Sequence, residues 1–100
     1  MFKEYDFSPG IVTFNDYDIS IEDEINENNN NLTEDMLQVE FENNIVLDVG
    51  WYSGIKCFIV FVIKNYDWEK PLLRLESNSY RELKISLDKA MSLIRKNLCG

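Results

Sequence analysis

The segment KCFIVFVIK at residues 56–64 constrains the fold of this chain more than any other part of the sequence. Its seven central residues are all apolar and are rich in β-branched and aromatic types, so the segment has no polar face. Such a run is typical of a strand that is covered on both sides of its sheet. It is also far too short to cross a bilayer as a helix. We therefore predict a central strand here, with other parts of the chain packed on each face.

Neighbouring segments have the pattern of further strands. Residues 36–42 alternate apolar with polar side chains, and residues 45–52 return with an apolar side chain at every second position, which is the period of a strand. Asn43 and Asn44, between them, can adopt positive φ at both positions of a two-residue hairpin turn. A shorter strand is expected at residues 72–77. Together these segments predict a β-meander.

The C-terminal segment predicts an amphipathic helix that covers one face of the sheet. Ser79, followed three residues later by Glu82, forms a capping box. After it, apolar residues recur at spacings of three and four and form one stripe: Tyr80, Leu83, Leu87, Ala90, Met91, Ile94 and Leu98. The predicted fold class is therefore α+β, an antiparallel β-meander sheet of four to five strands packed against a C-terminal α-helix, in a single domain over residues 1–100.

The N-terminal third has weaker patterns. Residues 1–14 scatter aromatic side chains around a Pro9-Gly10 turn signal, which predicts an irregular segment leading into a short strand. We expect its aromatics to cover part of the sheet face opposite the helix. Residues 17–22 alternate as a half-buried strand does. The asparagine-rich residues 26–33 predict a mobile loop, because asparagine favours turns over regular backbone hydrogen bonding.

Charge is divided unevenly along the chain. Residues 4–55 contain thirteen Asp and Glu and no Lys or Arg, whereas residues 56–100 contain nine basic and five acidic residues. An acidic run can be merely a solvated surface, although surfaces that serve solubility alone normally mix both signs. The contrast argues against nucleic acid or an anionic membrane as a direct partner and favours a basic protein surface. The densest carboxylates are the predicted partner-binding residues: Asp16, Asp18, Glu22, Asp23, Glu24, Glu27, Glu34 and Asp35.

Aromatic residues supply one further candidate contact. Neighbours on a strand point to opposite faces, so one of Trp51 and Tyr52 is expected in the core and the other at the surface. We assign Trp51 to the core and Tyr52 to the partner-binding surface, because exposed tyrosines are common binding anchors. Trp68, in the loop after the central strand, is predicted either to cap the core or to stand at its rim, and we favour the core.

The sequence offers no catalytic signature. It has no histidine, no glycine-rich phosphate loop and no Ser or Cys in a nucleophile context, so we predict a protein that is not an enzyme and has no cofactor. A calcium loop counted from Asp16 fails at its sixth position, where Ile21 stands in place of glycine, and we predict no metal site. Cys57 and Cys99 are expected to be free thiols. Because the first residues lack the features of a secretory signal, we expect a cytoplasmic protein.

In its general character, and in the segments VLDVGWY (46–52) and DWEKP (67–71), the chain resembles the immunity proteins of bacterial contact-dependent growth inhibition and related polymorphic toxin systems. The resemblance implies a partner, the C-terminal toxin domain of a secreted effector, which is often a basic nuclease. It also implies tight, non-catalytic binding in the cytoplasm of the producing cell, and it brings no active-site residues with it. Two other functions fit the same carboxylates: an inhibitor that imitates nucleic acid, and a soluble adaptor subunit.

Overall fold

The computed structural model describes residues 5–15 and 36–99 of the chain. These residues form five strands and one α-helix, with a short 3-10 turn between the second and third strands. In chain order they are β1 (Ile11–Asn15), β2 (Leu37–Phe41), η1 (Glu42–Asn44), β3 (Ile45–Tyr52), β4 (Cys57–Lys64), β5 (Leu73–Ser77) and α1 (Tyr80–Cys99). The strand predicted at residues 17–22, the loop predicted at residues 26–33 and the eight acidic candidates from Asp16 to Asp35 lie outside the described residues.

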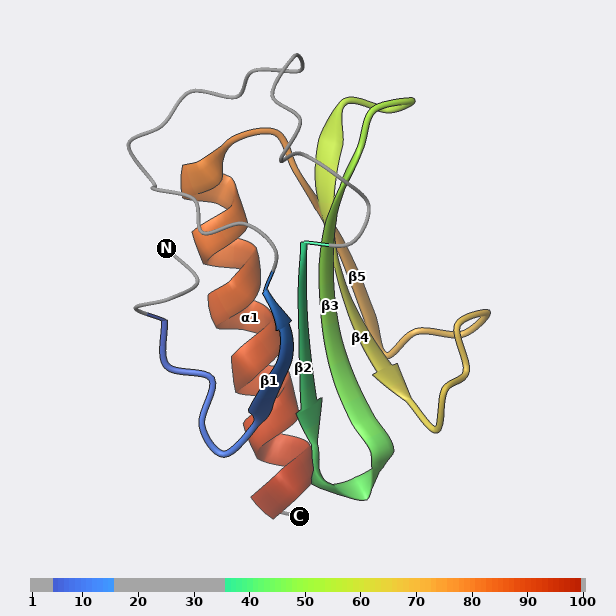
Figure 1. Cartoon of the computed structure of the whole chain (residues 1–100), viewed down its shortest axis with the longest axis vertical. Coiled ribbons are helices and arrows are strands. Elements are labelled where there is room, and N and C mark those ends of the chain that lie inside the picture. The colour runs from blue at the N-terminus through green and yellow to red at the C-terminus, as the bar shows by residue number, and fades with distance from the viewer. Residues whose placement is uncertain (1–4, 16–35, 100) are drawn as a thin grey trace.

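The strands form one antiparallel sheet in the order β1-β2-β3-β4-β5, so each strand pairs with its neighbours in sequence. The helix α1 lies across one face of this sheet (Figure 1). The predicted fold class, an α+β meander sheet packed against a C-terminal helix, is confirmed. We call the sheet face under α1 the inner face and the opposite face the outer face.

The turn between β2 and β3 is built on two asparagines. Asn43 and Asn44 have φ angles of 63° and 58°, as predicted, in the left-handed region that asparagine tolerates better than most residues. The connection has three residues rather than two, because Glu42 joins the 3-10 turn. A second left-handed pair, Asn65 and Tyr66, turns the chain away at the end of β4. These two turns fix the ends of the central strands.

The inner face holds the hydrophobic core. Phe58 on β4 is fully buried, and its ring centroid lies 5.0 Å from that of Trp51 and 5.3 Å from that of Tyr80. Trp51 therefore belongs to the core, as predicted. The helix contributes six members of its predicted apolar stripe to the same cluster: Tyr80, Leu83, Leu87, Ala90, Met91 and Ile94.

The predicted capping box begins α1, with one difference from the usual pattern. The Glu82 N–H donates to Ser79 Oγ at 3.2 Å, as the pattern requires. The Glu82 carboxylate accepts from the N–H of Asn78 at 2.7 Å, one residue earlier than the usual acceptor contact. A buried pair of hydroxyls, Ser77 and Ser86, lies 2.7 Å apart and ties the end of β5 to the helix. These contacts direct the chain from the sheet edge back across the inner face.

Tyr5 and Phe7 of the N-terminal segment pack on the inner face, which corrects for these two residues the expectation that the aromatics of the segment cover the outer face; Phe2 and the side chain of Phe14 lie outside the described part of the chain. Phe7 is buried in the same cluster as the helix residues. The Tyr5 hydroxyl donates to Asp88 of α1, and Arg95 donates to two backbone carbonyls of the segment at 3.0–3.2 Å. An irregular segment needs polar partners for its backbone, and the helix supplies them together with an apolar surface.

Candidate functional site

The outer face of the sheet carries aromatic and charged side chains. Alternate residues of each strand belong to the core, and those between them point outward. The outward-facing residues are Gln38 and Glu40 on β2, Val46, Asp48 and Tyr52 on β3, Cys57, Ile59, Phe61 and Ile63 on β4, and Arg74 and Glu76 on β5. The helix α1 covers the inner face and leaves this outer face without a helical layer (Figure 1). Val46, Cys57, Ile59 and Ile63 are nevertheless buried, so the accessible part of the outer face lies around Tyr52, Phe61 and Arg74.

Three aromatic side chains run across the outer face and are called here the aromatic strip: Tyr52, Phe61 and Trp68. The Phe61 ring centroid lies 6.4 Å from that of Tyr52 and 6.2 Å from that of Trp68, and both contacts are edge-to-face. The prediction that Trp68 packs on the core is wrong. Its side chain is 48% exposed, because the β4–β5 connection places it against Phe61 on the outer face.

An open hollow of about 410 Å³ lies at the Tyr52 end of the aromatic strip. Its apolar lining comes from Tyr52, Ile55, Ile59 and Phe61, and Arg74 stands at one side. Ile55, on the turn between β3 and β4, is 53% exposed. Because the hollow is open and mostly apolar, it is suited to a side chain presented by another molecule.

Arg74 forms the polar side of the hollow and is itself held by two contacts. Its guanidinium carbon lies 6.0 Å from the centroid of the Phe61 ring, and its Nη1 donates to the Glu76 carboxylate at 2.7 Å. This hydrogen bond, and a longer one from the Cys57 thiol, lower the pKa of Glu76. Burial raises the pKa of the Cys57 thiol, so this free cysteine is protonated and unreactive at neutral pH, in line with the prediction.

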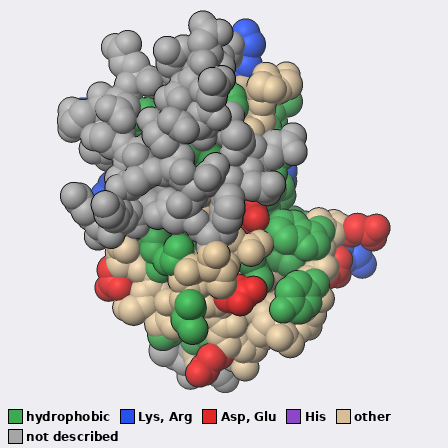
Figure 2. All heavy atoms as spheres, viewed as in Figure 1, with side chains coloured by type: hydrophobic (Ala, Val, Ile, Leu, Met, Phe, Trp, Pro, Cys, Tyr) green, Lys and Arg blue, Asp and Glu red, His purple; other side chains and the backbone are tan. Residues whose placement is uncertain are grey.

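The outer face and the helix surface differ in charge. Of the three carboxylates on the outer face, Asp48 is buried, Glu76 is paired with Arg74, and Glu40 is exposed. The exposed residues of α1 include five cations and two carboxylates: Arg81, Lys84, Lys89, Arg95 and Lys96, with Glu82 and Asp88. In Figure 2 hydrophobic side chains gather in the lower half of the view with acidic ones among them, beside the projecting β4–β5 connection. The outer face is thus aromatic with little exposed net charge, whereas the exposed surface of the helix is basic.

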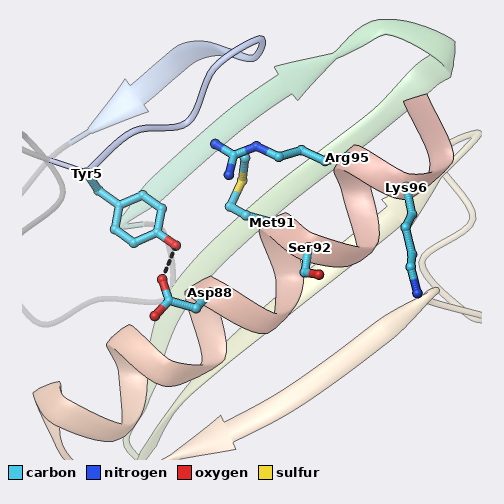
Figure 3. Close-up of a pocket in the computed structure, with 6 residues that line it drawn as sticks. All are labelled: Tyr5, Asp88, Met91, Ser92, Arg95 and Lys96. Carbon is cyan, nitrogen blue, oxygen red and sulfur yellow. Dashed lines mark hydrogen bonds between the residues drawn. The ribbon is translucent and has the colours of Figure 1, made fainter. Parts of the chain in front are cut away.

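A second depression, of about 530 Å³, lies where the N-terminal segment meets α1 (Figure 3). The Tyr5 hydroxyl donates to one oxygen of Asp88 at 2.5 Å, and Lys84 Nζ donates to the other at 3.1 Å. Burial, followed by the hydrogen bond to Asp88, raises the pKa of Tyr5, and the same hydrogen bond lowers the pKa of Asp88. At neutral pH the phenol is neutral and the carboxylate is charged, so the pair fastens the segment to the helix.

The structure places one of the nine predicted contact residues, Tyr52, and gives it aromatic and apolar neighbours. The other eight, the carboxylates between Asp16 and Asp35, lie outside the described residues. Sequence reasoning missed Phe61, Ile55 and Arg74. The pairing of Phe61 with both Asp48 and Arg74 could have revealed its outward position, but only once the register of the strands was known.

Comparisons with protein-family models, with curated proteins and with solved structures find no match to this chain. Within residues 5–15 and 36–99, no group of three or more His, Cys, Asp and Glu side chains is placed to hold a metal ion. No helix in the described part of the chain has both the length and the apolar character to cross a membrane. The features that bear on function are therefore the charge pattern of the chain and the aromatic side chains of the outer face.

Proposed function

We propose that this chain is a non-catalytic binding protein that neutralises a cognate toxin domain, as do the immunity proteins that its sequence resembles. The observation that carries the proposal is the charge pattern: thirteen carboxylates and no Lys or Arg in residues 4–55. A partner that recognises these carboxylates would be cationic. In this proposal the chain acts in the cytoplasm of the cell that makes the toxin.

The charge pattern suits a toxin that attacks nucleic acid. A nuclease attracts phosphates, so its substrate cleft is basic, and a carboxylate-rich surface can occupy the same cleft. Electrostatic complementarity also raises association rates to about 10⁸–10⁹ M⁻¹s⁻¹ at low salt. Fast capture matters for an inhibitor, because each toxin molecule has to be bound before it reaches its substrate.

The outer face adds support of a different kind. Tyr52, Phe61 and Trp68 present ring edges and partly exposed apolar surface beside a preformed hollow. Tyr and Trp are the residue types that dominate the energetics of protein interfaces. A partly exposed aromatic surface of this kind suits a protein that binds another protein.

The direct test is rescue of growth. The chain is expressed together with the product of the neighbouring open reading frame. We expect that product to arrest growth by itself, and cells to survive when the chain is also present. Association of the purified proteins is then measured over a range of salt concentrations. Reversal of Asp16, Asp18, Glu22 and Asp23 to lysine is expected to slow association and to flatten its salt dependence. Reversal of Lys89 and Lys96 on α1 is the control and is not expected to slow it.

Two outcomes contradict the proposal. One is a chain that neither rescues growth nor binds the toxin domain. The other is a chain that inhibits a nucleic-acid enzyme of the host or of a phage in the absence of any toxin, which would identify an inhibitor that imitates nucleic acid. A stable complex between the chain and a protein that is not toxic would instead indicate an adaptor subunit.

A further inference from the structure

We infer that two copies of this chain associate through the edge strand β5, in an antiparallel pairing centred on Leu75. A two-fold axis then passes beside Leu75, and the two five-stranded sheets join into one continuous sheet. The inference goes beyond the proposed function and does not depend on it.

The first argument is that β5 is an edge strand with accessible side chains. Among the described residues, β5 (Leu73–Ser77) pairs only with β4 and forms the edge of the sheet opposite β1 (Figure 1). An edge strand directs every second backbone N–H and C=O away from the sheet, where they can pair with another strand. Leu72, just before β5, is 42% exposed, and the side chains of Arg74 and Glu76 are 43% and 51% exposed.

The second argument is that the sequence of β5, LRLES, is complementary to itself. In an antiparallel pair centred on Leu75, residues at equal distances from Leu75 on the two copies face each other. Arg74 therefore lies directly opposite Glu76 of the second copy on the outer face, and the reverse contact forms with it. On the inner face, where Leu75 packs against the core cluster, Leu75 meets Leu75 of the second copy. Opposite charges and apolar side chains in directly opposing positions stabilise a strand pair.

The third argument is that these charges select one register. Within each copy Arg74 Nη1 donates to the Glu76 carboxylate at 2.7 Å, which uses one of the five N–H donors of a guanidinium. Both side chains can therefore take a second partner, and in the pair each charge has opposite charges on two sides. A shift of the register by two residues would instead set Arg74 against Arg74, or Glu76 against Glu76, and like charges directly opposite each other destabilise a strand pair.

The other edge of the sheet lacks these features. In β1 the side chains of Ile11 and Val12 are 71% and 45% exposed, but the pairing of β1 with β2 shifts between Val12 and Phe14. Such a bulge disturbs the ladder and is a common means of blocking edge-to-edge pairing. β1 also has no charged side chain that would select a register, whereas the pairing of β5 with β4 is regular.

The test measures self-association of the full chain by sedimentation velocity. A pair of five-residue strands covers less area than the roughly 1,200–2,000 Å² typical of stable complexes, so we expect a weak dimer that appears between about 10 μM and about 1 mM. Arg74→Glu sets only carboxylates against one another, and Glu76→Arg sets only guanidinium groups. Each variant alone is expected to dimerise at least about tenfold more weakly than wild type. In an equimolar mixture of the two variants each Glu again faces an Arg, and the affinity is expected to return to within about threefold of wild type.

The mixture supplies its own matched controls. The mixed dimer has the same composition and net charge as the wild-type dimer, and both of its members lack the ion pair within the chain, as they do alone. Recovery can therefore come only from contacts between the copies. Glu76→Arg also makes each copy less negative, so general repulsion between acidic chains does not explain its loss of dimer.

Hydrogen exchange on wild type guards against variants that fail to fold. Exchange at residues 73–77 is expected to slow as the protein concentration rises, while exchange in β1 stays unchanged. The inference is overturned if wild type remains monomeric up to about 1 mM, if either variant alone dimerises as tightly as wild type, or if the mixture remains monomeric. Protection of β1 or α1 in place of β5 overturns it as well. None of these results bears on whether the chain neutralises a toxin domain.

Discussion

On β4, Phe58, Val60 and Val62 face α1 and are fully buried, whereas Phe61, on the other face of the same strand, keeps part of its ring exposed. The two sets of side chains come from one continuous apolar run. The inner set is covered by the helix. On the outer face, Cys57, Ile59 and Ile63 are buried as well, and Phe61 is the partly exposed member, beside the Arg74 guanidinium and Trp68. An apolar run with no polar face therefore contains both core and surface, and its composition alone does not tell one from the other.

The largest expected effect comes from truncating the inner face. Phe58→Ala leaves a cavity between Trp51 and Tyr80, and we expect the free energy of unfolding to fall by about 3–5 kcal/mol. Phe61→Ala is the matched change on the outer face and is expected to cost only about 1 kcal/mol, since less buried area is lost. Urea unfolding followed by circular dichroism measures both. Equal losses would mean that the outer face is packed like the core.

The next effect tests how closely the N-terminal segment approaches the inner face. A Cβ atom at Gly10 would overlap the ring of Phe41 and lie 2.6 Å from Val39 Cγ1. We expect Gly10→Ala to lower the free energy of unfolding by about 1–3 kcal/mol, because the segment has to move away from the sheet. Thermal unfolding gives the value. A variant as stable as wild type would place the segment farther from these side chains.

A smaller effect is expected where the same segment is fastened to the helix. Tyr5→Phe removes the hydrogen bond to Asp88 and is expected to cost about 0.5–1.5 kcal/mol at neutral pH. Urea unfolding at pH 7 measures this cost. Asp88→Asn is the companion variant, because it removes the charge and keeps the shape.

The pH dependence of the same contact has two limits. The pKa of Tyr5 is raised above its ordinary 10.0, so the stability it contributes is present below pH 10.0 and falls as pH rises above that value. The pKa of Asp88 is lowered from its ordinary 3.8, so its contribution is present above pH 3.8 and falls as pH decreases below it. The difference in stability between wild type and Tyr5→Phe should shrink at both extremes. A difference that stays constant from pH 3 to pH 11 would rule out this hydrogen bond as its source.

The smallest effect is expected at the rim of the hollow, and its sign is opposite. Gly54 does not use the left-handed backbone conformation, and a Cβ atom there meets nothing within 4 Å. Gly54→Ala is therefore expected to stabilise the fold by about 0.4–1 kcal/mol, by restricting the unfolded chain. The melting temperature measures this gain. A loss of stability would show that the β3–β4 turn needs the freedom of glycine.

Most of the fold could be predicted because its signals are periodic. The alternation of side chains along residues 45–52 predicted both ends of that strand correctly. Apolar residues at spacings of three and four predicted the helix. The Asn43-Asn44 turn followed from the backbone preference of asparagine. These signals are local, so they can be recognised in the sequence before it is known which residues pack against them.

The rest depends on contacts between distant parts of the chain. The side of the sheet taken by Tyr5 is decided by Asp88, eighty-three positions away, and no spacing in the sequence connects them. The position of Trp68 depends on how the β4–β5 connection folds back onto Phe61. The hollow combines residues from two strands, an edge strand and a turn, so of its lining only Tyr52 could be anticipated.

The order of the elements also has a consequence for synthesis. All five strands precede α1, and each pairs with its neighbour in sequence, so hairpins can form as the nascent chain leaves the ribosome. The helical part of the cover over the inner face is made last. At about 5–20 residues per second, the 20 residues of α1 take roughly one to four seconds to translate. During that interval the part of the inner face that α1 covers in the complete fold is still exposed. We therefore expect newly made chains to be more prone to aggregate than the complete fold.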